Sequence, residues 1–227
     1  MTKRILVLLL LLLMTGCGAG EPNAENEPSG EQPPAAQSEQ QKDLAALSVF
    51  GTSVGLDDDG NVVSLHFTSA RHGGGTNAHN GGLTDAALVH LKSMTKLEIL
   101  GLDFAKITDA GLVHLAGLTN LKKIAFYATD VTGTGFGHLK ALTKLEELGL
   151  NYIGLTDDGL ANLKGMTSLV VLDLRGTPIT DVGLAHLHGL TNLRSVRLGG
   201  GIISKVTKEA IAELKKAIPN CTINSDP

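Results

Sequence analysis

The sequence lacks several features that would define its class at once. Among 227 residues it has no tryptophan, two tyrosines and five phenylalanines, and its two cysteines are too few for a disulfide framework. Nineteen Lys and Arg stand against 23 Asp and Glu, a formal net charge of −4, so nothing indicates a nucleic-acid partner. The motifs G-x-S-x-G, HExxH, Walker A and CxxC are all absent. We therefore expect no enzyme and no cofactor.

No apolar run is long enough for a permanent transmembrane helix. The run at residues 5–14, ILVLLLLLLM, follows the basic Lys3 and Arg4 and covers about ten residues, whereas a spanning helix needs roughly 20. It leads into Met14-Thr15-Gly16-Cys17, which resembles a bacterial lipobox. The resemblance implies a lipoprotein signal peptide over 1–16 and lipidation of Cys17. The protein would then be exposed outside the cytoplasm, in the cell envelope, and anchored to a bacterial membrane by lipid. An ordinary signal peptide that leaves Cys17 as a free thiol is the alternative.

The segment after Cys17 is too polar to fold by itself. Residues 18–40, GAGEPNAENEPSGEQPPAAQSEQ, contain no Leu, Ile, Val or aromatic residue, so they cannot bury enough apolar surface to offset the entropy of ordering. We interpret 17–40 as the lipidated cysteine and a disordered tether.

The rest of the chain repeats with a period of 24 residues. Four consecutive segments share the same pattern: LEILGLDFAKITDAGLVHLAGLTN (97–120), LKKIAFYATDVTGTGFGHLKALTK (121–144), LEELGLNYIGLTDDGLANLKGMTS (145–168) and LVVLDLRGTPITDVGLAHLHGLTN (169–192). In each, LxxLxL predicts a short strand, Thr-Asp (or its equivalent) precedes a helix, and leucines three residues apart mark one helix face. The apolar surface that one unit buries does not offset the conformational entropy that the unit loses on folding, so the units must stack.

This pattern resembles the leucine-rich repeats, and is close to the cysteine-containing type of F-box proteins with Thr where that type has Cys or Asn. Thr129 and Thr177 hold that position, whereas Ala105, Ile153 and Gly201 depart from it. The resemblance implies a single α/β domain, a right-handed solenoid with a parallel sheet on its concave face and short helices on its convex face. An F-box function is rejected because no F-box-like helical segment precedes the repeats.

The two ends of the repeat array differ from the repeats. Residues 41–61 are expected to form an N-terminal cap, with a helix over 42–50 and a hairpin over 52–67 that turns at Asp59-Gly60. Repeats then occupy 62–204, and 205–227 form a C-terminal cap with an amphipathic helix over 206–218 and a last strand at 221–223. Cys221 is interpreted as a buried thiol.

The outward positions of the strands define the expected binding surface. They alternate with the inward leucines, and an exposed solenoid sheet is the usual partner surface of this architecture. The candidate contact residues on this face are His66, Asp103, Tyr127, Asn151, Asp173, Arg175 and Arg197. The alternative is a solvated face on which Asp173, Arg175 and Arg197 only neutralise one another.

One insertion interrupts the repeat. RHGGGTNAHNGG (71–82) lies in a connection of 15 residues between the strand and the next inward leucine, whereas the same connection in the 97–120 repeat has four residues. The connection starts at the end of the strand, at the rim of the predicted concave face. We interpret it as a rim loop that contacts a partner through Arg71, His72 and His79, with a metal or small-ligand site there as the alternative. A separate histidine column, at His90, His114, His138 and His186, is interpreted as local packing, since helices about 10 Å apart cannot share one zinc ion.

These observations favour a non-catalytic interaction module over the other classes. We expect a monomeric, lipid-anchored domain that binds an unknown protein or glycan through its concave face. The alternatives are a metal- or small-ligand-binding protein that uses the 71–82 loop, and a purely structural envelope protein.

Overall fold

The computed structural model describes residues 38–67, 82–199 and 205–226. All of them lie in one compact unit, residues 37–227. One hydrophobic core runs through this unit from Leu47 to Cys221. No helix in the described part of the chain is long and apolar enough to cross a membrane. Cys17 and the predicted signal peptide lie outside the described residues.

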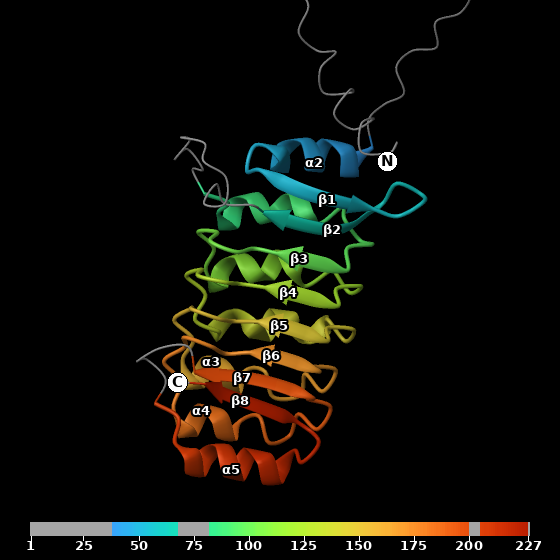
Figure 1. Ribbon diagram of the computed structural model, residues 1–227. Coiled ribbons are helices and arrows are strands. Elements are labelled where there is room, and N and C mark those ends of the chain that lie inside the picture. The colour runs from blue at the N-terminus through green and yellow to red at the C-terminus, as the bar shows by residue number, and fades with distance from the viewer. Residues whose placement is uncertain (1–37, 68–81, 200–204, 227) are drawn as a thin grey trace, which may run out of the picture. The chain divides into compact units, whose positions relative to one another are not determined.

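This unit is built on one sheet whose eight strands follow chain order (Figure 1). The strands are β1 Thr52–Leu56, β2 Val62–Phe67, β3 Ile99–Gly101, β4 Lys123–Ala125, β5 Glu147–Gly149, β6 Val171–Asp173, β7 Ser195–Gly199 and β8 Thr222–Asp226. β1 pairs with β2 antiparallel, and every later neighbour is parallel. From β3 to β6 the register advances by 24 residues per strand, as at Leu100↔Ile124 and Leu148↔Leu172, so the sequence period is the structural period.

Helices cover one face of the sheet, and no described helix lies on the other, here called the open face (Figure 1). The helices are α2 Glu39–Ser48, the 3₁₀ helices η3 Asp85–Leu91, η4 Asp109–Leu115 and η5 Thr134–Ala141, and the α-helices α3 Asp157–Ala161, α4 Asp181–Ala185 and α5 Lys208–Ala217. A leucine spacing of three suits the 3₁₀ geometry, in which residues i and i+3 lie directly above one another. The strands and short helices form a leucine-rich repeat solenoid, as the sequence pattern predicts.

The core consists of the leucines that define the repeat. In the 169–192 unit, Leu169 and Leu172 on the strand side and Leu184 and Leu187 on the helix side are fully buried, as the sequence predicts. Burial of each such side chain contributes roughly 1.5–3 kcal/mol. Because each unit covers the leucines of its neighbours, the core is continuous along the stack.

Aspartates at the helix starts join each repeat to the next, a feature that the sequence analysis did not identify. Asp109, the first residue of η4, accepts hydrogen bonds from the Thr132 hydroxyl (2.7 Å), the Thr132 N–H (2.9 Å), the Gly133 N–H (2.9 Å) and the Gly135 N–H (2.8 Å). Burial opposes ionisation of Asp109, but these hydrogen bonds outweigh it and hold the pKa of the carboxyl below its ordinary value. Asp85, Asp157 and Asp181 each accept two hydrogen bonds from Thr108, Thr180 and Thr207 in the same way.

We call this series of aspartates, Asp85, Asp109, Asp157 and Asp181, the aspartate ladder. It is interrupted at Gly133, which occupies the Asp position of its repeat. A Cβ there would lie 2.8 Å from the Gly159 Cα, and φ of Gly133 is +94°, so only glycine fits without strain. The backbones of the two repeats meet directly instead, and the Asn162 amide donates to the Gly133 carbonyl at 3.0 Å.

The N-terminal cap begins slightly earlier than the sequence suggested. Ser38 and Gln41 form a capping box at the start of α2, so 38–40, which we assigned to the tether, belong to the cap helix. The hairpin turn lies where it was predicted: Asp57 accepts from the Asn61 and Asp59 N–H groups, and Gly60 has a φ of +82°.

The C-terminal cap consists of α5 and β8, close to the ranges expected. The Cys221 side chain is buried, and burial raises the pKa of its thiol, which agrees with a structural role.

Candidate functional site

The turns that follow the strands are linked by hydrogen bonds from repeat to repeat along one rim of the open face. Residues 104, 128, 152 and 176 occupy one position of successive repeats and share a left-handed backbone, with φ of 59°, 52°, 58° and 66°. Each donates its N–H to a carbonyl of the next repeat, for example Phe104 to Tyr127 at 2.7 Å and Tyr152 to Arg175 at 2.8 Å. The stacking of the repeats therefore fixes this conformation.

The left-handed conformation favours glycine, yet only Gly176 meets that preference. Phe104, Ala128 and Tyr152 are the only non-glycine residues with positive φ in the described ranges, and each costs about 1–2 kcal/mol relative to the right-handed region. Strain that neighbouring structure imposes is often found at functional sites, so this observation motivates a functional hypothesis for the rim.

Three aromatic side chains pack against one another on this rim. The ring centroids of Phe104 and Tyr127 are 4.8 Å apart with an interplanar angle of 72°, and those of Tyr127 and Tyr152 are 5.3 Å apart at 65°, both edge-to-face. The Tyr152 ring lies against Gly176, where a Cβ would come within 2.5 Å of its Cδ1. We call Phe104, Tyr127 and Tyr152 the aromatic rim. It brings together both tyrosines of the chain, and Tyr152 is 46% exposed.

A charged cluster continues the aromatic rim. Arg175 binds Asp173 through Nε (2.9 Å) and Nη2 (2.6 Å), and Arg197 Nη1 lies 3.6 Å from the same carboxylate. Hydrogen bonds to Asp173 and its negative charge raise the pKa of the Arg175 guanidinium, with smaller contributions from Tyr152 and Tyr127. Asp173 is 7% exposed, so it positions the two arginines. The three residues pair with one another, as in the alternative interpretation of this face, and contact of Asp173 with a partner stays a prediction.

Small side chains border the aromatic rim on the open face. Gly101, Ala125 and Gly149 occupy one row of the sheet in register. The His66 ring lies over Gly101, where a Cβ would come within 2.7 Å of the ring. The aromatic rim therefore stands beside a row of small side chains.

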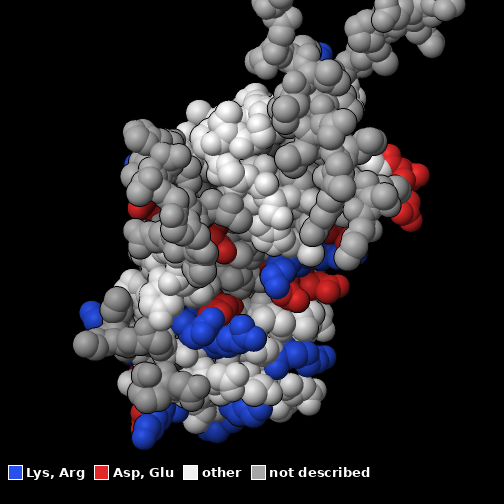
Figure 2. Space-filling model, turned by 45° about the horizontal axis from the view of Figure 1, so that its top comes forward, with Lys and Arg blue, Asp and Glu red and all other residues white. Residues whose placement is uncertain are grey.

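A second row of the open face carries an ion pair. Lys123 Nζ lies 2.8 Å from the Glu147 carboxylate on the neighbouring strand. Figure 2 shows positive and negative side chains mixed over the middle of the molecule, so charge of one sign does not define the partner.

The described candidate residues have the following positions. Tyr127, Asn151, Arg175 and Arg197 lie on the open face or its rim, and Asp103 accepts a hydrogen bond from the Tyr127 N–H at 3.1 Å. Arg71, His72 and His79 of the predicted rim loop lie outside the described residues.

Phe104 and Tyr152 were not predicted, because strand alternation assigns no role to a turn position. The signal available in the sequence was an aromatic side chain in two repeats at the position where a third repeat has glycine.

The histidine column lies in the helix layer. His90 lies in the helix layer, where its Nδ1 is 2.7 Å from the Asp43 carboxylate of α2, a local link between the cap and the first repeat. In the parts of the chain that the structure describes, no three His, Cys, Asp or Glu residues are grouped so as to hold a metal ion.

Comparison with protein families finds one match, within the repeats. The model of the leucine-rich repeat family matches residues 165–187, about one repeat. Among solved structures, an internalin (inlF) from Listeria monocytogenes is similar, with a TM-score of 0.49 and 23% identity over 61% of this chain and 37% of that chain. This chain therefore spans little more than a third of that internalin. No curated protein matches the sequence. The chain's own repeat, buried leucines and parallel sheet give it the leucine-rich repeat fold.

Proposed function

We propose that this protein is a non-catalytic interaction module that binds another protein through the aromatic rim and the adjoining open face. The observation that carries the proposal is the exposure of Tyr152 within a packed aromatic group, next to two arginines that Asp173 holds in place. Tyr and Arg are the residue types most enriched at energetic hot spots of protein interfaces.

The side chains of the aromatic rim are preorganised. The left-handed backbone, the edge-to-face contacts and the ion pairs restrict the rim side chains before any partner arrives. Binding then costs less side-chain entropy, since immobilising a flexible side chain costs about 0.5–1.5 kcal/mol. A contribution of these rings to binding would explain why Phe104 and Tyr152 occupy positions where the left-handed conformation costs free energy.

The cellular context belongs to the same proposal. The lipobox-like sequence before Cys17 and the polar segment 18–37 support a domain held outside the cytoplasm by lipid. The partner would then be a protein of the bacterial cell envelope or of the surroundings; a glycan partner is the second outcome of the test below.

The proposal can be tested with defined probes. We would select peptides from a random library on immobilised residues 37–227, the compact unit that contains the whole described core. The binding of the selected peptides to variants of the domain would then be measured by fluorescence anisotropy. Tyr127→Ala and Tyr152→Ala should each weaken binding about tenfold or more, the loss typical of a hot spot. A glycan array would be examined with the same variants.

Two matched variants on the other side of the molecule serve as controls. Val113 and Val182 are 48% and 64% exposed in the helix layer, so Val113→Ala and Val182→Ala remove apolar surface without touching the rim. They should leave binding unchanged. Equal binding by the tyrosine variants, or a loss confined to the valine variants, would reject the rim as the binding surface.

A further inference from the structure

The core of the solenoid is incompletely covered at both ends of the repeat array. The described apolar residues that pack on the core but remain only partly buried are Leu44, Phe50, Val54, Ala87, Val206, Ala210, Ile211 and Ile223. All except Ala87 belong to the two caps. Inside the array each repeat covers the next, whereas the outer sides of α2–β1 and α5–β8 have no described neighbour.

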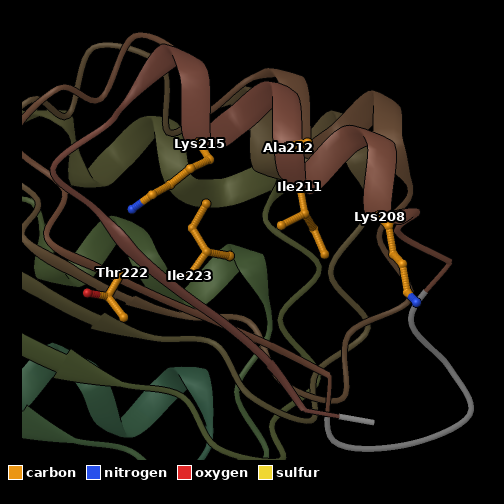
Figure 3. Close-up of a pocket in the computed structure, with 6 residues that line it drawn as sticks. All are labelled: Lys208, Ile211, Ala212, Lys215, Thr222 and Ile223. Atoms are coloured by element: carbon orange, nitrogen blue, oxygen red, sulfur yellow. The ribbon is translucent and has the colours of Figure 1, made fainter.

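The C-terminal end has a groove between its last helix and its last strand. A cavity of about 400 Å³ is lined by Ile211, Ala212 and Ile223, with Lys208 and Lys215 at its margins (Figure 3). Lys215 Nζ donates to the Cys221 carbonyl, which holds this end of the helix on the strand. The groove lies between the helix and strand layers at the end of the stack, where a following repeat would place its core residues.

Both ends also present a sheet edge. β1 and β8 are the first and last strands of the sheet, and among the described residues neither has a strand on its outer side. Unpaired edge strands are sites at which another chain can add a strand. β8 is parallel to β2, and β1 is antiparallel to β2. If one domain followed another along the same axis, β8 of the first would therefore meet β1 of the second in antiparallel orientation.

The two ends carry opposite charge. Residues 38–67 contain five acidic residues and one lysine, a net charge of 1 − 5 = −4. Residues 205–226 contain four lysines and three acidic residues, a net charge of 4 − 3 = +1. Lys and Arg predominate over the lower part of Figure 2.

The charges also lie at corresponding edges. Asp57, Asp58 and Asp59 come just before the first residue of β2 in the chain, and Lys215 and Lys216 come shortly before the first residue of β8. Because β2 and β8 run parallel, the first residues of both strands lie at the same edge of the sheet. A stacked second copy would therefore bring the acidic turn towards the two lysines.

We propose that the domain associates with a second copy of itself end to end, with the basic C-terminal cap of one copy seated on the acidic N-terminal cap of the next. In this arrangement β8 and β1 extend one sheet across the two copies, and the half-buried side chains of both caps cover one another. Such an interface is heterologous, so it leaves one free end of each kind and permits longer assemblies.

The charges distinguish this arrangement from symmetric pairs. Two N-terminal caps would bring two net charges of −4 together, and two C-terminal caps would bring lysines against lysines. The proposal concerns the ends of the stack and does not depend on the aromatic rim.

Complementary charge reversals test the proposal. An acid-ended variant carries Lys216→Glu with Asn220→Glu, and a base-ended variant carries Asp58→Lys with Asp59→Lys; all four side chains are exposed. A control variant carries Lys140→Glu with Ala141→Glu, which make the same change of charge as the acid-ended pair at exposed positions in the middle of the array. Circular dichroism would establish that each variant of residues 37–227 folds.

Sedimentation velocity over a range of protein concentration gives the readout. The wild type and the control should associate, and more strongly at about 0.01 M than at about 0.15 M ionic strength, since the Debye length falls from about 30 Å to about 8 Å. Each end variant alone should lose association about tenfold or more, and an equimolar mixture of the two should recover it, because opposite ends are again paired.

Three results would overturn the proposal. They are a wild type that stays monomeric at all concentrations and both ionic strengths, end variants that associate as the wild type does, and a mixture that does not recover association. Tyr152→Ala, on the rim, should associate normally, which separates this interface from the proposed partner site.

Discussion

Asp109 offers a quantitative test of how the repeats are held together. Its carboxylate accepts four hydrogen bonds from the next repeat, two from Thr132 and one each from Gly133 and Gly135. In Asp109→Asn an NH2 group replaces the carboxylate oxygen that accepts from Thr132, and an NH2 group donates hydrogen bonds but does not accept them. A hydrogen bond to a charged group contributes about 1.5–3 kcal/mol, and this site is only partly buried, so loss of two should lower the free energy of unfolding by about 2–3 kcal/mol.

The effect should depend on pH in a defined direction. Because the folded-state pKa of Asp109 is lowered, its contribution is fully present above the unfolded-state pKa of about 3.9 and is lost as pH falls through the folded-state value. The difference in unfolding free energy between wild type and Asp109→Asn should therefore be constant from neutral pH to about pH 5 and shrink below about pH 4. Urea denaturation followed by circular dichroism at a series of pH values measures it.

An exposed aspartate in another helix provides the matched control. Asp158 lies in the first turn of α3 and its side chain is exposed, so Asp158→Asn should change the free energy of unfolding by no more than about 0.5 kcal/mol. If Asp109→Asn were as stable as the wild type, or if the difference between them persisted unchanged in acid, the role assigned to the aspartate ladder would be refuted.

Three further outcomes follow from single positions. Gly176→Ala should displace the Tyr152 ring and cost about 1–2 kcal/mol of stability because of the left-handed backbone, with a loss of peptide binding that anisotropy would detect. Gly133→Asp restores the repeat consensus, yet it should destabilise the domain by about 2 kcal/mol or more in urea titrations, since its Cβ would strike Gly159. In residues 37–227, native Cys221 should react with a thiol reagent about a hundredfold more slowly than in urea, because its thiol is buried and its pKa raised; comparable rates would contradict this.

The repeat architecture could be predicted from sequence because one rule recurs without gaps over residues 97–192. An apolar residue at a fixed position must face the core in every unit, so Leu100, Ile124, Leu148 and Leu172 determine the register of their strands. The hairpin turn at Gly60 followed from an equally local signal. The link between Asp109 and Thr132 was missed because both residues also explain a helix start within their own repeats.

The candidate site was only half predictable. Strand alternation identified Tyr127 and Arg175, because those positions inherit their direction from the sheet. The packing of Phe104 and Tyr152 on Tyr127 depends on the left-handed turn, which stacking of the repeats imposes and which aromatic residues do not favour by themselves. The engagement of Asp173 by two arginines likewise depends on a neighbouring repeat.

Site-specific photo-crosslinking in the cell that produces the protein tests most directly whether the aromatic rim is the binding surface. A benzoylphenylalanine would replace Tyr152 on the rim in one variant and Val182 in the helix layer in another; the two side chains are 46% and 64% exposed. We predict a discrete cross-linked protein from position 152 and none from position 182. A cross-linked product from position 182 alone would contradict the proposed function.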